Sequence, residues 1–380
     1  MGDRMVHAFA LGLTLALVGV SAGSSAPQAV AVAASSGCRG GWVVQQRATF
    51  DGFLSGVAAI SGADAWAVGG RFDPQTGLET TLAEHWDGRA WVAVSSPNPT
   101  PPYGLTGDAL FGAAAVSATD VWAVGGAGQM SGQMAGGIAE HWDGTGWTVV
   151  PTPTFSGGGE LEGAAAVSGR DVWAVGLGDV ASANGSQAVH ALHWNGTVWT
   201  SVSAPAPGSF HALMAVARIP RTGDLWAVGS QSPGRGVPDR PLIERWNGVR
   251  WIVLKSPPVG GYLAGVTALG PKGAWAVGGT NAGAPLILHW NGMRWSSVRV
   301  PAGSGRSLSG VAALSARSAW AVGSTILYWN GTRWTAARWP KPVHASLDAI
   351  AVSASRSGWT AWAVGSWGSS ASPLVVSRCG

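Results

Sequence analysis

Trp66-Ala67-Val68-Gly69 is one of seven copies of the run W-A-V-G in this 380-residue sequence. The other copies begin at Trp122, Trp173, Trp226, Trp275, Trp320 and Trp362. Successive copies are 42 to 56 residues apart, the shortest step running from Trp320 to Trp362 and the longest from Trp66 to Trp122. An internal repeat of this length with variable insertions predicts a propeller or another repeat array.

Each copy lies between a small-residue run and an aromatic turn. Gly56-Val57-Ala58-Ala59-Ile60 precedes the first W-A-V-G, and His85-Trp86-Asp87-Gly88 follows it, with Trp91 three residues after the glycine. Asp-Gly or Asn-Gly between short apolar segments is a strong hairpin signal, because these residues tolerate positive φ. We name the four predicted strands a (the small-residue run), b (W-A-V-G), c (ending at the hairpin) and d (starting at the second Trp). The sequence therefore predicts an all-β, seven-bladed β-propeller with four antiparallel strands per blade.

Most tryptophans occupy fixed repeat positions. Twenty of the 23 lie at the start of strand b, the end of strand c or the start of strand d, which predicts packing between blades rather than a ligand site. The histidines at one strand position of separate blades are expected to pack there, because they lie too far apart to share a metal ion; they are His85, His141, His193 and His289. An aspartate two residues before W-A-V-G, as at Asp64, is expected to cap the a–b turn.

The two ends of the chain are expected to share the last blade. The seventh repeat stops after strand c, at Cys379-Gly380, while Gly40 to Gln45 resembles a strand d that opens on Trp42. The N-terminal strand should therefore complete the last blade. Cys38 and Cys379, the two cysteines of the chain, flank the interrupted hairpin, which predicts a disulfide between them.

The segment before the repeats is typical of a secretory signal. Arg4 and His7 precede an apolar run that is too short for a comfortable membrane span, and small residues follow. We expect residues 1–34 to be a signal peptide and linker, residues 38–380 to be the propeller, and the protein to be secreted. No further segment is long and apolar enough to cross a membrane. Charged residues make up 11% of the chain and the net charge is +4, without a basic run, which argues against nucleic acid as a partner.

The repeats resemble those of secreted bacterial β-propellers with W-A-V-G and W-N-G-x-x-W motifs, grouped loosely as kelch-like, galactose-oxidase-like or sialidase-like. The resemblance covers residues 38–380. The hairpin Asp87-Gly88-Arg89-Ala90-Trp91 is similar to the Asp-box of sialidase propellers, although here the acidic residue directly precedes the glycine. In that family the box is structural, so the resemblance implies no catalytic residue. A galactose-oxidase copper site would need a Tyr–Cys crosslink, which three tyrosines and two cysteines that we expect to be paired argue against. We expect no cofactor and no metal.

One side chain per blade is expected to face the central channel, at the residue that opens strand a. The aligned residues are Ser55, Phe111, Glu162, His211, Ala264, Ser309 and Asp348. Three of them are ionisable, and the neighbouring pair Glu162 and His211 could perform acid–base catalysis, together with Asp348. The alternative interpretation is a hydrated channel mouth lined by ordinary polar side chains.

Loops on one face are the second candidate site. The d–a loops place an aromatic side chain near the channel in most blades, which could stack on a ligand or could equally cap the gap between blades; these residues are Phe53, Tyr103, Phe155, Phe210, Tyr262 and Trp339. The b–c loops are longer in the first four blades than in the fifth and sixth, and carry charges outside the repeat pattern such as Asp73 and Arg240.

Three functions remain open from the sequence. The first is a secreted binding module, in which a glycan or a protein ligand lies on the face of the d–a and b–c loops. The second is a secreted carbohydrate-active hydrolase or lyase, with Glu162, His211 and Asp348 as catalytic residues at the channel mouth. The third is a structural protein of the cell envelope. In each case we expect a monomer.

Overall fold

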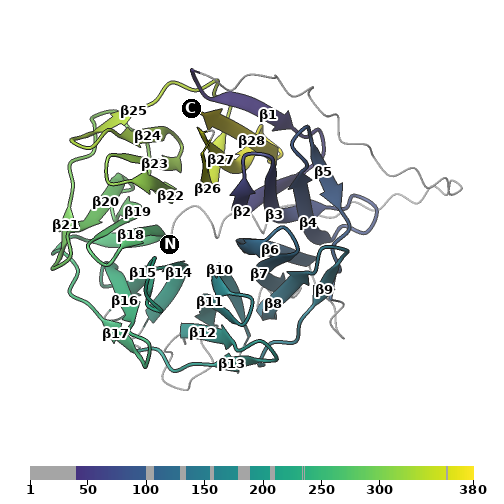
Figure 1. The fold of residues 1–380 in the computed structure, drawn as a ribbon, viewed down its shortest axis with the longest axis horizontal. Coiled ribbons are helices and arrows are strands. Elements are labelled where there is room, and N and C mark those ends of the chain that lie inside the picture. Colours follow the sequence, from purple (N-terminus) through teal and green to yellow (C-terminus); the bar gives the residue numbers. More distant parts are fainter. Residues whose placement is uncertain are drawn as a thin grey trace, which may run out of the picture.

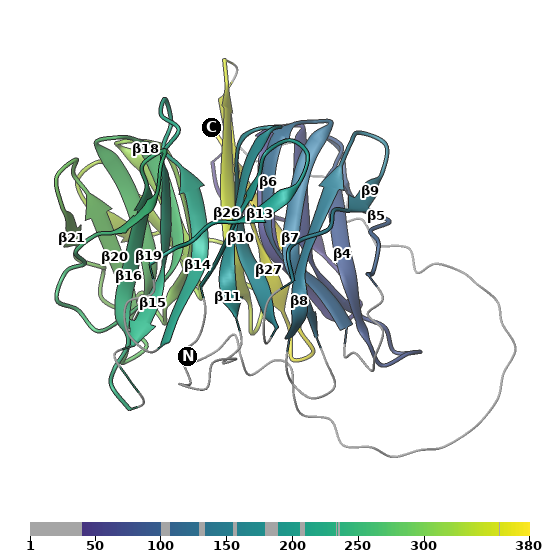
Figure 2. The same ribbon diagram turned by 90° about the horizontal axis from the view of Figure 1, so that it is seen from below.

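A computed structural model of the chain shows an all-β propeller. It describes residues 40–99, 107–128, 134–154, 158–178, 189–205, 210–232, 234, 236–356 and 358–380. Among these residues there are 28 β-strands, and no helix long and apolar enough to span a membrane. The sheets are arranged radially around a central opening (Figure 1), and their inner strands run along the short axis of the disc (Figure 2).

The strands follow one another in a four-strand rhythm. Strand a of successive blades is β2 (Gly52–Ser61), β6 (Gly107–Ser117), β10 (Gly159–Ser168), β14 (Phe210–Arg218), β18 (Gly261–Gly270), β22 (Leu308–Ser315) and β26 (Ser346–Ser355). Strand b is β3 (Asp64–Phe72), β7 (Asp120–Gly128), β11 (Asp171–Gly178), β15 (Leu225–Ser232), β19 (Gly273–Thr280), β23 (Ser318–Gly323) and β27 (Gly358–Trp367). Strand c is β4 (Glu79–Trp86), β8 (Met134–Trp142), β12 (Val189–Trp194), β16 (Arg240–Trp246), β20 (Pro285–Trp290), β24 (Ile326–Trp329) and β28 (Ser372–Cys379). Strand d is β5 (Trp91–Val94), β9 (Trp147–Val149), β13 (Trp199–Ser201), β17 (Trp251–Val253), β21 (Trp295–Ser297), β25 (Trp334–Ala336) and β1 (Val43–Arg47).

The sheets have the predicted antiparallel order a-b-c-d. Five are separate four-stranded sheets, and one eight-stranded sheet joins the strands β2–β5 to β6–β9 through the single parallel pair Glu79–Gly107. The sheet that contains the C-terminus has the order β1-β28-β27-β26, so the prediction that the N-terminal strand completes the last blade is confirmed.

Cys379 ends β28, opposite Thr360 of β27. Its predicted partner Cys38 and the predicted signal segment, residues 1–34, lie outside the described residues. The Cys38–Cys379 disulfide therefore stays a prediction.

The tryptophan of W-A-V-G joins neighbouring blades, as predicted. Trp66 is buried, with its ring 4.8 Å from Trp142 and 5.1 Å from Trp147 of the next blade. Trp362 makes the corresponding contacts with Trp86 (4.9 Å) and Trp91 of the first blade. The first and last blades therefore share one hydrophobic core, and the ring of blades is closed.

The glycine of W-A-V-G is required by the close approach of strands a and b. A Cβ atom on Gly69 would lie 1.8 Å from the carbonyl oxygen of Phe53, and one on Gly176 would lie 1.9 Å from that of Glu160. Real Cβ atoms do not approach other atoms so closely, so no residue with a side chain fits here without moving the inner strand. The repeat therefore keeps glycine because a carbonyl group of strand a occupies the space that a side chain would need.

Candidate functional site

A β-bulge in strand a aims one side chain per blade into the central channel. In β2 the pairing with β3 shifts between Leu54 and Gly56, which leaves Ser55 as the extra residue. The inner strand of every other blade shifts at the equivalent place. A bulge re-aims the residue it leaves unpaired, and here that residue points toward the axis. The bulge residues are Ser55, Phe111, Glu162, Met214, Ala264, Ser309 and Asp348.

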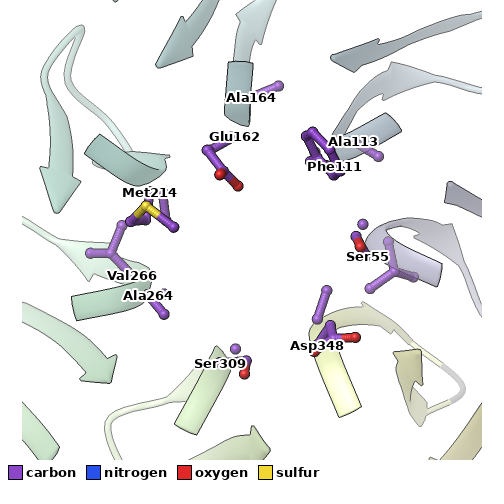
Figure 3. Close-up of a pocket in the computed structure, with 18 of the residues that line it drawn as sticks. Ser55, Phe111, Ala113, Glu162, Ala164, Met214, Ala264, Val266, Ser309 and Asp348 are labelled. Atoms are coloured by element: carbon purple, nitrogen blue, oxygen red, sulfur yellow. The ribbon is translucent and has the colours of Figure 1, made fainter. Parts of the chain in front are cut away.

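These side chains line a cavity of about 160 Å³. Figure 3 shows the carboxylates of Glu162 and Asp348 directed into the opening from different blades, Glu162 between Phe111 and Met214, and Asp348 near Ser55 and Ser309. Of the described residues that line the cavity, the charged ones are Glu162 and Asp348. The channel therefore combines an acidic character with apolar and hydroxyl surfaces.

Glu162 and Asp348 face the channel as the sequence predicts, but they do not open their strands. Glu162 is the fourth residue of β10, and Asp348 is the third residue of β26. At roughly 3.3 Å per residue, the ring of side chains lies several ångströms inside the channel from the loop face. A ligand must therefore reach into the channel to contact it.

The expected place of His211 in this ring is wrong. His211 lies three residues before the bulge, is 3% exposed, and has no hydrogen-bond partner for either ring nitrogen among the described residues. Burial holds the pKa of His211 below its usual range. Met214 takes the channel position instead, so the predicted acid–base pair with Glu162 does not form. The residue of β14 that faces the channel is hard to predict from this alanine-rich run, because Ala215 stands where most blades have glycine after the bulge.

The predicted aromatic residues pack on neighbouring backbone. The ring of Phe53 lies over Gly70 of its own blade, and the ring of Tyr262 lies over Gly279. Trp339 packs against the core between the last two blades. Trp339 therefore fits the interpretation of a cap between blades, whereas Phe53 and Tyr262 pack on their own sheets. Phe210 is half-buried at the start of β14, and Tyr103 and Phe155 lie outside the described residues.

The two predicted loop charges lie apart from the channel ring. Asp73 is half-buried and accepts hydrogen bonds from the backbone N–H of Gln75 (2.8 Å) and the hydroxyl of Thr76 (3.0 Å). The backbone hydrogen bond from Gln75 lowers the pKa of Asp73. Arg240 is exposed at the start of β16, opposite Gln231. Asp73 thus stabilises its own loop, and neither residue is among those that line the cavity.

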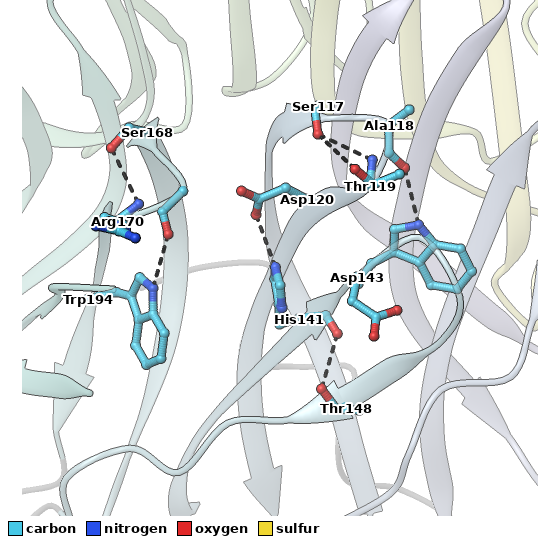
Figure 4. Close-up of polar contacts among 12 residues, drawn as sticks. Ser117, Ala118, Thr119, Asp120, His141, Asp143, Thr148, Ser168, Arg170 and Trp194 are labelled. Atoms are coloured by element: carbon cyan, nitrogen blue, oxygen red, sulfur yellow. Dashed lines mark hydrogen bonds and ion pairs between the residues drawn. The ribbon is translucent and has the colours of Figure 1, made fainter. Parts of the chain in front are cut away.

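The repeated histidines form a structural contact near the opposite face. His141 Nε2 lies 3.0 Å from Asp120 Oδ1, and the ring of His141 packs on Trp122 at 4.5 Å (Figure 4). The same His–Asp pair recurs in the blades of His85 and His193. The aspartate therefore ties strand b to strand c, rather than capping the a–b turn as expected. The described residues contain no group of three or more His, Cys, Asp or Glu side chains suited to holding a metal ion.

Buried carboxylates away from the channel were not predicted from the sequence. Glu79, Asp108 and Glu140 meet at the seam between the first two blades, and burial raises their pKa values to about 7, 6 and 7, with the charge of Asp108 adding to the shift at Glu79 and at Glu140. The hydroxyl of Ser96 donates to Glu140 at 2.5 Å. Glu84 and Glu244 occupy the same strand-c position as Glu140 in other blades, and burial raises their pKa values to about 7 and 8. The sequence feature that could have revealed Glu84, Glu140 and Glu244 is a glutamate two residues before the hairpin tryptophan.

Comparison with known proteins identifies the fold alone. No protein-family model and no curated protein matches the chain. Among solved structures, "YCF48 bound to D1 peptide" is 14% identical, with a TM-score of 0.56 over 89% of this chain and 96% of that one. YCF48 from Cyanidioschyzon merolae is 15% identical, with a TM-score of 0.57 over 89% and 98%. The WD40 β-propeller domain of Doa1 is 11% identical, with a TM-score of 0.55 over 88% and 95%. At these identities the likeness supports a propeller and carries no function.

Proposed function

We propose that the chain is a secreted, seven-bladed β-propeller that binds a protein segment over the channel, on the face of the d–a and b–c loops. Five four-stranded sheets and one eight-stranded sheet made of two such units support seven blades, each with one copy of W-A-V-G. The charged start and apolar run of residues 1–34 support secretion.

The observation that carries this proposal is the variety of the bulge residues. The residue before each bulge is always a fully buried leucine: Leu54, Leu110, Leu161, Leu213, Leu263, Leu308 and Leu347. The residue after it is always glycine or alanine. Between these constant positions, the bulge presents serine, phenylalanine, glutamate, methionine, alanine, serine and aspartate. Varied side chains held on a rigid scaffold are typical of a recognition surface.

Two further observations favour a protein ligand over the alternatives. A propeller of similar fold is described as bound to a peptide, which is a precedent for the architecture. The hydrolase or lyase alternative named Glu162, His211 and Asp348 as catalytic residues, and of these His211 is buried away from the channel. A glycan ligand would be expected to stack on exposed aromatic rings, whereas Phe53 and Tyr262 are half-buried and pack against glycines of their own sheets.

The test is a binding selection followed by variants on each face. The mature protein is used to select binders from a phage-displayed library of random peptides, with a glycan array in parallel. We expect peptides to be selected, and their binding to be lost when Phe111 and Asp348 are both changed to alanine. Met293→Thr is the matched control, because Met293 is exposed on a c–d hairpin where Thr145 and Thr197 stand in other blades. Failure to select any peptide, or glycan binding alone, would contradict the proposal.

Closure of the ring by a disulfide is part of the proposal. Mass spectrometry of a non-reduced digest of the secreted protein should find the peptides of Cys38 and Cys379 linked. Two free thiols would refute the pairing. Size-exclusion chromatography with light scattering of the same sample should give the mass of a monomer.

A further inference from the structure

We propose that the face of the disc opposite the d–a and b–c loops docks on an anionic phospholipid surface, through the turns of the fourth to the seventh blade. This turn face consists of the a–b turns and the c–d hairpins, and it is the upper edge of the disc in Figure 2, where the C-terminus lies. It is a second surface, independent of the ligand site of the proposed function. Its turns are built alike from blade to blade, yet they differ in charge and in exposed apolar side chains.

The a–b turn and the c–d hairpin of one blade lie side by side. A Cβ atom on Gly331 would lie 2.9 Å from Cγ of Arg317, and one on Gly292 would lie 3.4 Å from Cα of Lys272. Figure 4 shows the same arrangement in the second blade, with Asp143 beside the a–b turn. The hairpin tryptophans of each blade also pack on strand b of the blade before it. Consecutive blades therefore join their turns into one continuous surface.

Two turn positions are acidic on one side of the ring and not on the other. The residue that opens the c–d hairpin is Asp87 or Asp143 in the first two blades, and asparagine in the third to the sixth. Either residue builds the turn, since Oδ1 of Asn330 accepts the N–H groups of Thr332 and Arg333 as Oδ1 of Asp87 does in its own hairpin. The residue two before W-A-V-G is aspartate in the first four blades, and glycine, serine or threonine in the last three. The turns of the fifth and sixth blades therefore carry no acidic residue.

The turns that have lost these acidic residues are basic. A cation stands in the a–b turn of the fourth to the seventh blade and before the second hairpin tryptophan of the fourth to the sixth; the residues are Arg221, Lys272, Arg317, Arg356, Arg250, Arg294 and Arg333. All seven are exposed, and none forms an ion pair within the described part of the chain. The acidic residue of these turns, Asp224, is paired with Arg245. In the first two blades the one cation of the turns is Arg89. The turn face is therefore electrostatically divided, and its basic half attracts an anionic partner.

Two exposed apolar side chains lie at hairpin tips within the basic half. Val249 is 80% exposed and Met293 is 84% exposed, the highest values among the described exposed large hydrophobic residues. Each directly precedes a cation, Arg250 or Arg294, and the other hairpins have threonine or arginine at the same position. An anionic bilayer rewards this combination, because the apolar tip enters the boundary of the acyl chains while the cation stays at the level of the phosphates.

A soluble polyanion would account for the cations but not for the apolar tips. The phosphates of a nucleic acid would contact the cations and leave Val249 and Met293 in water. Stacking of unpaired bases would need exposed aromatic rings, and the described turns of these blades present none. Figure 2 places the two faces at opposite edges of the disc, so docking by the turn face leaves the channel and its loops accessible. An anionic bilayer is therefore the partner that uses both features of the surface.

The test is co-sedimentation of the mature protein with vesicles, of phosphatidylcholine alone and of phosphatidylcholine mixed with phosphatidylglycerol. A DNA duplex is titrated in parallel as a soluble polyanion. The charge variant is Arg294→Gln/Arg333→Gln. The tip variant is Val249→Thr/Met293→Thr, which introduces the residue that three other blades have at this position.

The matched control is Arg299→Gln/Arg338→Gln. It removes the same charge from the same two blades, at exposed residues that follow strands β21 and β25 on the way to the loop face. Each control residue lies five positions after the cation of the charge variant, and at roughly 3.3 Å per residue this exceeds the Debye length of about 8 Å at physiological salt. The melting temperature of each variant checks that it is folded.

We expect the native protein to bind the mixed vesicles and not phosphatidylcholine alone. The charge variant should bind the mixed vesicles at least about tenfold more weakly, and the tip variant about fivefold more weakly, while the control binds as the native protein does. Equal binding to both kinds of vesicle, no binding to either, or a control that loses as much as the charge variant would overturn the inference. Binding of the DNA duplex as tightly as the vesicles, with no loss in the tip variant, would make the partner a soluble polyanion and overturn it too. Peptide selection reports on the loop face alone, so the proposed function and this inference fail separately.

Discussion

Replacing Glu244 by leucine should stabilise the protein. Glu244 is fully buried in β16, and neither of its carboxylate oxygens has a hydrogen-bond partner among the described residues. At the equivalent position Glu140 accepts from Ser96, which follows Trp91 by five residues. Five residues after Trp199 the preceding blade has Ala204, which offers no side-chain donor. Glu244 is therefore a buried carboxyl group without the donor that Glu140 has among the described residues.

The size of the effect follows from the pKa of Glu244. Burial raises it from the ordinary 4.5 to about 8, so at pH 7 the folded chain holds a proton that the unfolded chain releases. Keeping this proton on Glu244 lowers the free energy of unfolding by about 3 kcal/mol at pH 7, since each unit between the unfolded pKa of 4.5 and the working pH contributes about 1.4 kcal/mol. At pH 5 the same cost is below about 1 kcal/mol. Leucine removes it and fills a similar volume, as Leu192, Leu288 and Leu327 do at this position in other blades.

The assay is urea unfolding of the native protein, Glu244→Leu and Glu244→Gln at pH 5, 7 and 8. We expect the leucine variant to gain about 3 kcal/mol at pH 7, more at pH 8 and little at pH 5. The glutamine variant should lose the pH dependence but keep a buried, unpaired polar group, so its gain should be smaller. A leucine variant that is less stable than the native protein at pH 7, or a gain equal at all three pH values, would refute the reasoning.

The remaining predictions concern the seam, the repeat glycine and the repeat aspartate. The pKa values of Glu79, Asp108 and Glu140 are raised in the folded protein, so their contribution to stability is fully present below the unfolded pKa and is lost as the pH rises toward 7. The melting temperature should therefore fall between pH 5 and 8, and thermal melts should show a smaller fall for Asp108→Asn. Gly176→Ala should destabilise by about 3 kcal/mol or more in denaturant titration because its Cβ would meet the carbonyl of Glu160, whereas Gly223→Ala, where nothing lies within 4 Å, should change little. Gly273→Asp should supply His289 with the acidic partner that His141 has in Asp120, raising the pKa of His289 in an NMR titration; an unchanged pKa would contradict the structural role assigned to the His–Asp pair.

The strands and their order were predictable because the repeat places, at the strand ends and turns, residues that few other residue types could replace. Asp87 shows why the hairpins were found: its carboxylate accepts the N–H groups of Arg89 (2.8 Å) and Ala90 (2.9 Å), and Gly88 takes a φ of +89°. These are properties of the local sequence. The closure of the ring was predictable for a different reason. The last repeat lacks one strand and the N-terminal segment supplies an extra one, so the extra strand can only complete the last blade.

The register of the inner strands was harder to predict. A run of small residues such as Ala212-Leu213-Met214-Ala215-Val216 fits more than one alignment, and only the position of the bulge decides which side chain faces the channel. The buried carboxylates were missed because their environment is set by the neighbouring blade. Glu140 and Glu244 have the same place in the repeat, yet the seam supplies Ser96 to Glu140 and, within the described part of the chain, no side-chain donor to Glu244.

The position of the bulge explains how a ring of near-identical blades can carry a specific site. The leucine before the bulge and the glycine or alanine after it are both fixed by contact: the leucine is buried, and a Cβ on Gly112 would lie 2.9 Å from Gly163 of the next blade. The bulge residue is released from both constraints, because it leaves the ladder and lines the cavity. Substitution there changes the channel without changing the packing. Glu162 and Asp348 can therefore set the charge of the site at little cost in stability, which separates them from Glu244, whose charge opposes the fold.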